Sequence, residues 1–101
     1  MSGTDFVGSV IVLPGGAVPW PITTMDDLTL EAFAPVLEVA KSLDVFLLGC
    51  GVRMQLLRRD LRIALRDGGL AIDTMGTGAA CRSYNVVVTE GRSVAAALLA
   101  I

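Results

Sequence analysis

Short apolar runs alternate with turn-forming residues along this chain, and the pattern predicts several strands. Residues 9–13 are mostly β-branched and end at residues 14–16 (Pro-Gly-Gly), which favours a strand followed by a turn. Residues 17–20 are extended in character, but prolines flank Trp20, so we expect an edge or a loop there. Residues 44–48 end in an unbroken apolar run, typical of a central strand buried on both faces of a parallel sheet.

Helical spacing appears in two segments. Residues 30–42 carry apolar positions at helical intervals, and Asp26, Asp27 and Thr29 before them offer N-cap oxygens. Pro35 interrupts this segment, so we expect two short helical pieces or one distorted helix.

The second segment, residues 57–67, is the clearest helix, with an apolar stripe on one side and arginines on the other. Glycines at 68 and 69 provide its stop, and a short strand is expected at 70–74. Together with the strand at 44–48, this helix predicts a strand–helix–strand unit with a right-handed crossover.

The last third of the chain allows two structures. Residues 85–89 and 93–100 can pair as a hairpin around a glycine-containing turn, and local β propensity slightly favours this. Alternatively, Thr77 caps a helix from 78 to about 90, Gly91 ends it, and 93–100 form the final strand. Either structure is compatible with one α/β domain covering residues 1–101.

Composition narrows the function classes. Hydrophobic residues make up 53% of the 101 residues and charged residues 18%, which argues against disorder and leaves apolar surface for a partner. A net charge of −2 argues against a nucleic-acid binder. No apolar run approaches the ~20 residues of a transmembrane helix, so no transmembrane segment is predicted.

The chain contains no histidine, which removes the Ser-His-Asp and Cys-His catalytic arrangements and the commonest zinc ligand. Cys50 and Cys81 are far apart and form no CxxC motif. Because residues 1–8 do not resemble a signal peptide, we expect reduced thiols in an intracellular protein. We predict no catalytic residue, no metal and no cofactor.

A ligand pocket is one candidate site. Gly49 and Gly51 lie between a predicted strand and a helix, where α/β sheets bind phosphates, but Met54 breaks the full GxGxxG fingerprint and a simple tight turn is the alternative. Cys81 in the first turn of a C-terminal helix would be a reactive thiol, or else a buried packing residue. The candidate ligand-binding residues are Gly49, Gly51, Arg53, Thr77, Cys81, Tyr84 and Asn85.

A partner surface is the other candidate. Trp20 can serve as an exposed interface anchor or can cover one end of the core. The arginines of the second helix can bind phosphates or an acidic partner, or can simply form its solvated face. The candidate partner-binding residues are Trp20, Arg58, Arg59, Arg62 and Arg66.

Several short motifs resemble one protein family. They are residues 18–20 (Val-Pro-Trp), 49–53 (Gly-Cys-Gly-Val-Arg), 77–85 (Thr-Gly-Ala-Ala-Cys-Arg-Ser-Tyr-Asn), 90–92 (Glu-Gly-Arg) and 94–98 (Val-Ala-Ala-Ala-Leu). Over nearly its whole length the chain is similar to the mitochondrial complex I assembly factor 3 proteins and their uncharacterised bacterial and archaeal homologues.

This resemblance implies a three-layer α/β fold with a central mixed sheet flanked by helices and a last strand antiparallel to its neighbours. It favours the helix at 78–90 over the hairpin. Two departures stand out: Gly76 occupies a position where the family usually has Asp, and we expect the first family strand to be missing or reduced at residues 1–7. Its absence would leave residues 9–13 as an unpaired edge.

The functional expectation is a non-enzymatic assembly protein that binds protein partners, such as membrane-complex subunits or another assembly factor. The alternative is a small-molecule-binding or enzymatic domain with its pocket near Gly49, Arg53, Cys81 and Asn85. The resemblance implies the cytoplasm for a bacterial protein and the mitochondrial matrix, at the inner membrane, for a eukaryotic one. The sequence leaves open whether the protein forms a homo-oligomer.

Overall fold

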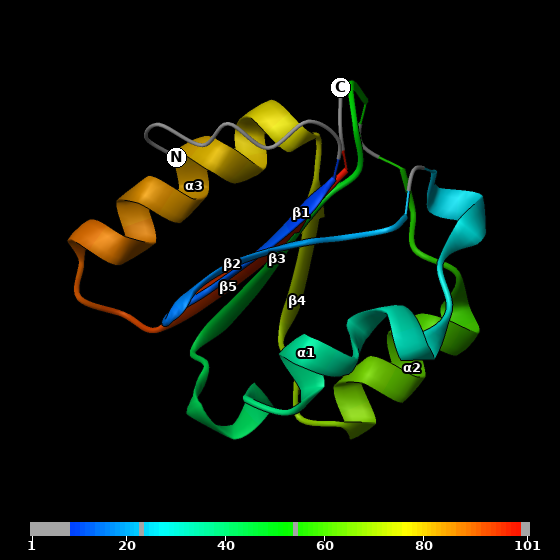
Figure 1. The fold of residues 1–101 in the computed structure, drawn as a ribbon, viewed down its shortest axis with the longest axis horizontal. Helices are drawn as coiled ribbons and strands as arrows, with labels where there is room; N and C mark the ends of the chain where they lie inside the picture. The colour runs from blue at the N-terminus through cyan, green and yellow to red at the C-terminus, as the bar shows by residue number, and fades with distance from the viewer. Residues whose placement is uncertain (1–8, 23, 54, 100–101) are drawn as a thin grey trace.

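Five strands form one mixed sheet in the computed structural model, which describes residues 9–22, 24–53 and 55–99 (Figure 1). The apolar run predicted at 44–48 is an interior strand with a neighbour on each side, and its Phe46 and Leu47 are buried on opposite faces of the sheet. The strand order is β2-β1-β5-β3-β4. The strands are β1 (Val10–Leu13), β2 (Gly16–Pro19), β3 (Val45–Gly49), β4 (Ile72–Met75) and β5 (Val94–Leu98).

The last strand differs from the expectation on one of its two sides. β5 is antiparallel to β1, with Val10 opposite Leu98, but parallel to β3, with Val45 opposite Val94. The reason is topological: β5 follows a crossover helix, and a strand–helix–strand crossover joins parallel strands. The expected antiparallel pairing therefore holds toward β1 only.

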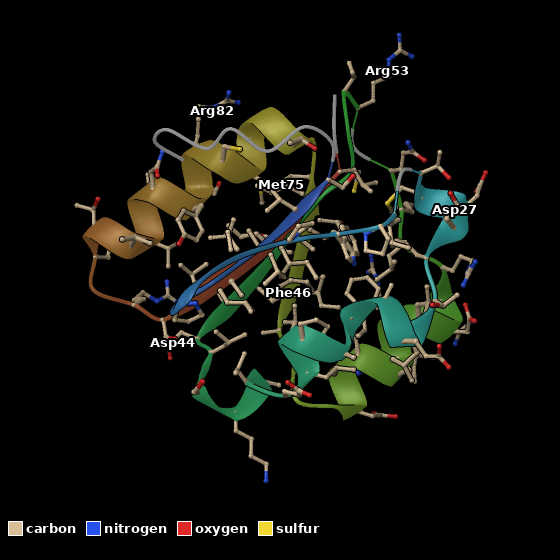
Figure 2. All side chains as sticks on the ribbon, viewed as in Figure 1. Asp27, Asp44, Phe46, Arg53, Met75 and Arg82 are labelled. Carbon is tan, nitrogen blue, oxygen red and sulfur yellow. The ribbon has the colours of Figure 1, made fainter. Side chains whose placement is uncertain are left out.

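Helical segments cover both faces of the sheet and make the three layers that the resemblance implies (Figure 1). α3 (Thr77–Thr89) packs on one face, where Met75 points (Figure 2). The other face carries α1 (Ala34–Leu37), α2 (Arg59–Asp67) and the 3₁₀ turns η1 (Met25–Asp27), η2 (Leu30–Phe33) and η3 (Ala40–Ser42). Within the described residues, no helix is sufficiently long and apolar to cross a membrane.

The segment 30–42 is broken into short pieces, as Pro35 predicts. Pro35 lies in the first turn of α1, and because it has no N–H group the helical hydrogen bonding cannot run unbroken through it. Of the three predicted capping oxygens, Thr29 Oγ1 accepts a hydrogen bond from the Ala32 N–H at 3.3 Å. Asp26 and Asp27 lie inside η1 instead.

The C-terminal third contains the helix and not the hairpin, so the local β propensity of residues 85–89 was misleading. Val86 and Val88 are 58% and 47% exposed, while Ala80 of α3 is fully buried against the sheet. The final strand pairs with β1 and β3, which gives its hydrogen-bonding groups two partners instead of one. Tertiary pairing therefore outweighs local propensity here.

The expected reduction of a first family strand falls on residues 1–7, which lie outside the described residues. The prediction that residues 9–13 would be an unpaired edge is wrong. β1 is hydrogen-bonded to β2 on one side and to β5 on the other.

Candidate functional site

The buried Thr77 hydroxyl joins three segments where the parallel strands end. Its Oγ1 accepts a hydrogen bond from the Gly51 N–H at 2.8 Å and donates one to the Leu99 carbonyl at 2.8 Å. The Thr77 backbone N–H also donates to the Gly51 carbonyl at 2.8 Å. The predicted role of Thr77 as a helix cap is wrong, because Gly76 occupies the N-cap position and the hydroxyl points into the fold.

The two predicted phosphate-binding glycines have structural reasons to be glycine. A Cβ on Gly49 would lie 2.9 Å from Leu98 Cδ2 and 3.0 Å from the Thr77 Cα, so only glycine lets α3 begin so close to β3. Gly51 adopts a φ of 96°, in the left-handed region that favours glycine. Both observations fit the tight-turn interpretation. A role of the two glycines in ligand binding stays a prediction.

A small hollow of about 300 Å³ opens beside these strand ends. Only Gly51 among the predicted ligand-binding residues lines it. Cys50 is buried in its wall, and its Sγ lies 3.5 Å from the Gln55 carbonyl oxygen. The lining residues are Thr24, Met25, Asp26, Cys50, Gly51, Val52, Gln55 and Leu99.

The remaining predicted ligand-binding residues lie elsewhere. Arg53 is exposed and extends away from the body of the fold (Figure 2). Cys81 is the fifth residue of α3, beyond the predicted first turn, and with Tyr84 it packs half-buried against the sheet. Asn85 is exposed. Among the described residues, no hydrogen bond joins Arg53 to Tyr84 or Asn85, so the predicted pocket has no connected polar network.

Trp20 covers one end of the core, as the alternative to an exposed interface anchor predicted. Its side chain is only 5% exposed, and its Nε1–H donates to the Ala32 carbonyl at 2.8 Å. The ring meets Phe33 edge-on at 5.6 Å between centroids, and Phe33 meets Phe46 at 6.0 Å. The fold therefore does not expose Trp20 as an interface anchor.

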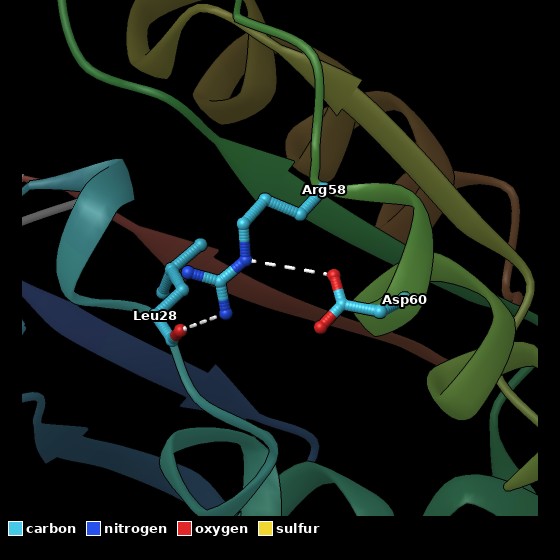
Figure 3. A network of polar contacts seen from close by, with 3 residues as sticks. All are labelled: Leu28, Arg58 and Asp60. Carbon is cyan, nitrogen blue, oxygen red and sulfur yellow. Dashed lines mark hydrogen bonds and ion pairs between the residues drawn. The ribbon is translucent and has the colours of Figure 1, made fainter.

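Four of the eight basic residues of the chain are concentrated on α2 and its N-cap. We call Arg58, Arg59, Arg62 and Arg66 the arginine face; all four are exposed. Figure 3 shows Arg58 Nη2 donating to the Leu28 carbonyl at 2.7 Å, with Nε 3.6 Å from Asp60 Oδ1. Because both charged partners are exposed, the ion pair adds little stability, and the carbonyl contact is what fixes Arg58 in place.

Arg62 and Arg66 line a wider groove of about 510 Å³ between α2 and the start of β4. Gly69, Leu70, Ala71 and Ile72 form the rest of its lining. No carboxylate of the described residues lies within 4.0 Å of either guanidinium. The sequence predicted the arginines but not this groove, because their position against β4 depends on how α2 packs.

Sequence reasoning also missed two exposed apolar residues in the connection from β3 to α2. Val52 is 75% exposed and Leu56 is 76% exposed. The available signal was their position, since both lie between Gly51 and the predicted helix, outside any helical or strand period. Isolated exposed apolar side chains are normal on protein surfaces, so these two residues do not by themselves mark a partner surface.

Curated proteins similar to this chain include vertebrate assembly factors. The protein named NADH dehydrogenase [ubiquinone] 1 alpha subcomplex assembly factor 3 from Homo sapiens is 27% identical over 99 residues, and the one from Bos taurus is 28% identical. The match covers 98% of this chain and 54% of each relative, so the chain spans about half their length. An uncharacterised protein of Rhodobacter capsulatus is 34% identical over 99 residues, which cover 98% of this chain and 74% of that protein.

Solved structures share the fold. A protein of Bartonella henselae described as an outer membrane protein superposes with a TM-score of 0.89 at 36% identity, covering 99% of this chain and 85% of that one. The Rpa2829 protein of Rhodopseudomonas palustris gives 0.87 at 35% identity, covering 100% and 75%. A Bordetella pertussis protein described as an Mth938-like domain gives 0.74 at 26% identity, covering 91% and 73%.

The family described as "Protein of unknown function (DUF498/DUF598)" matches residues 1–99. The resemblance recognised in the short motifs is thereby confirmed at the level of the whole chain. Sequence and fold agree, and the chain belongs to the DUF498/DUF598 family.

Proposed function

We propose that this protein is an assembly or interaction protein that works by binding a protein partner and catalyses no reaction. The similarity to relatives named as complex I assembly factors supports this role. Because the chain spans about half of those relatives, their partners come to it as proposals only. The proposed partners are subunits of a membrane complex or a second assembly factor, met in the bacterial cytoplasm or the mitochondrial matrix.

The arginine face is the observation that carries the proposal. Residues 58–67 hold four arginines and two aspartates, although the whole chain has a net charge of −2. Arg59, Arg62 and Arg66 are exposed, and within the described chain none has a carboxylate within 4.0 Å. Guanidinium groups held on a rigid helix pair bidentately with carboxylates, so an acidic protein surface is the partner chemistry we propose.

The competing proposal is a small-molecule site at the strand ends. The hollow beside Cys50 and Gly51 favours it, but its volume is at the lower end of the range usual for ligand pockets. The residues first predicted for it are dispersed: Arg53 is solvent-exposed, Cys81 packs on the α3 face, and Gly49 is covered by Thr77. We therefore rank this proposal second.

Photo-crosslinking in the source organism tests the binding proposal. Lys41 is the only lysine, so lysine-directed reagents would sample little of the surface. We would place a photoreactive phenylalanine analogue at position 63, a partly exposed site on α2, and at position 88 on α3 as the matched control. The proposal predicts a specific protein adduct from position 63, absent in Arg59→Glu/Arg62→Glu. No adduct, or the same adducts from both positions, overturns it.

A further inference from the structure

β4 forms a free edge of the sheet. It lies at the end of the strand order and pairs with β3 alone. The Phe46 N–H donates to the Ala71 carbonyl at 3.1 Å and the Cys50 N–H to the Met75 carbonyl at 2.8 Å, so the odd-numbered residues bond toward β3. Because backbone groups alternate along a strand, Ile72 and Thr74 direct their N–H and C=O groups outward. No strand of the described residues pairs with them there.

The groove lined by Arg62 and Arg66 reaches this edge, because Ile72 belongs to both. The two arginines are four residues apart on α2, which places their side chains on the same side of the helix. Leu70, Ala71 and Ile72 add an apolar wall. One groove thus combines outward backbone groups, apolar surface and two guanidiniums without a carboxylate partner.

The two sheet edges are not equivalent. β2, the opposite edge, ends in Pro19, which has no amide hydrogen to offer an added strand. Asp73 is the one acidic residue of β4, and by alternation it shares the α3 face with Met75. The α2 face of β4 therefore presents Ile72 beside the arginines and Thr74 further along the strand, with no acidic residue of β4 on that face.

We propose that an extended acidic segment of the protein partner adds a strand to β4 and places its carboxylates against Arg62 and Arg66. Main-chain pairing with Ile72 and Thr74 would supply affinity, and the guanidiniums would select for acidic side chains. This inference rests on the proposed function and specifies where and how the partner binds.

Selection from a library of random short peptides tests the inference on the full chain. We expect enriched peptides to be acidic and extended. In ¹⁵N-labelled protein, a bound peptide should slow hydrogen exchange of the Ile72 and Thr74 amides by about tenfold or more, since both gain a hydrogen-bond acceptor. The Asp73 amide is already directed at β3 and should change little.

Two variants and one control separate the contribution of the arginines to binding from that of the strand pairing. Arg62→Glu/Arg66→Glu should weaken binding by about tenfold or more, whereas Arg59→Glu, an exposed arginine outside the groove, should have a small effect. Thr74→Pro removes one outward amide and leaves the bonds of Asp73 and Met75 to β3, so it should also weaken binding. The ¹⁵N spectrum of each variant checks that it is folded.

Three results would overturn the inference: no enriched peptide, enriched peptides without acidic residues, or acidic peptides that bind without slowing exchange at Ile72 and Thr74. The last result would mean that the groove binds acidic groups without pairing a strand to β4. If the crosslink from position 63 is found while peptide pairing fails, this inference is wrong and the proposed function stands. If both fail, both are wrong.

Discussion

Thr77 illustrates how one buried hydroxyl determines the architecture of the strand ends. It lies at the start of α3 and bonds the Gly51 N–H and the Leu99 carbonyl, each at 2.8 Å. A threonine before a helical segment is ordinarily interpreted as a cap. The actual partners of Thr77 lie 26 and 22 residues away in the chain, so no local pattern reveals them.

Replacing Thr77 by valine should therefore be costly. Thr77→Val keeps the side-chain shape but leaves a buried N–H and a buried carbonyl without their partner, so we expect a loss of about 2 kcal/mol or more in the free energy of unfolding. Urea denaturation measures it. Thr77→Ser keeps the hydroxyl and should lose less than about 1 kcal/mol. Equal stability of the two variants would contradict the assigned role.

Gly49 provides a second residue-scale prediction. Gly49→Ala places a methyl group within 2.9–3.1 Å of Leu98 and Thr77, contacts that force α3 away from β3. We expect a loss of about 1–3 kcal/mol. Gly15→Ala is the matched control, since a Cβ there meets nothing within 4 Å, and it should stay within about 0.5 kcal/mol of the parent. A tolerated Gly49→Ala would return this glycine to the list of ligand-binding candidates.

The thiols test the catalytic alternative. Cys50 is buried and Cys81 half-buried, and with no histidine in the chain neither has that base beside it. A thiol reporter should react with Cys81 in the native protein no faster than with free cysteine, and with Cys50 only after unfolding. Cys81→Ser assigns the signal. A Cys81 that reacts many times faster than free cysteine would favour an enzymatic site.

At the scale of elements, the sequence is informative wherever one local pattern dominates. The apolar run of β3, the arginine-lined amphipathic α2 and the break at Pro35 were all predicted from residues close together in the chain. α3 was predicted only through the family resemblance, because its β-branched residues favour a strand and the pairing of β5 with β1 and β3, which excludes a hairpin, cannot be seen locally.

Glycine-to-alanine substitutions at the two ends of α3 should change the stability of the protein in opposite directions. Gly78 lies in the first turn, where an added Cβ comes no closer than 3.6 Å to Arg82, so Gly78→Ala should stabilise the protein by about 0.5–1 kcal/mol. Gly91 follows the helix with a φ of 78°, so Gly91→Ala should cost about 1 kcal/mol. Thermal unfolding compares the two, and a destabilising Gly78→Ala would contradict a helix at this position.

The candidate site was less predictable than the fold. Residue types suggested which side chains have useful chemistry, but Trp20 is buried because it packs against Phe33 and bonds the Ala32 carbonyl. Arg53 and Cys81 do not meet because Arg53 extends away from the fold while Cys81 packs against the sheet (Figure 2). The groove at Arg62 and Arg66 depends on the packing of α2 against β4. Such juxtapositions arise from tertiary structure, which residue spacing does not encode.

At the scale of the molecule, the two faces of the sheet differ in what they offer a partner. One is covered by α3, with exposed Val86 and Val88, and the other by α2 with the arginine face. The buried side-chain polar atoms of the described residues all have hydrogen-bond partners, so this interior needs no further ligand to satisfy it. We therefore propose the outer surface of α2 and the adjacent β4 edge as the partner site.

Affinity co-purification from the source organism shows whether a partner binds at the arginine face. The tagged full chain would be compared with Arg59→Glu/Arg62→Glu/Arg66→Glu and with Cys81→Ser, each checked for folding. We predict that the parent and Cys81→Ser recover the same protein partner in equal amount, and that the triple variant recovers about tenfold less or none. Equal recovery by the triple variant, or a loss confined to Cys81→Ser, would rule out partner binding through the arginine face.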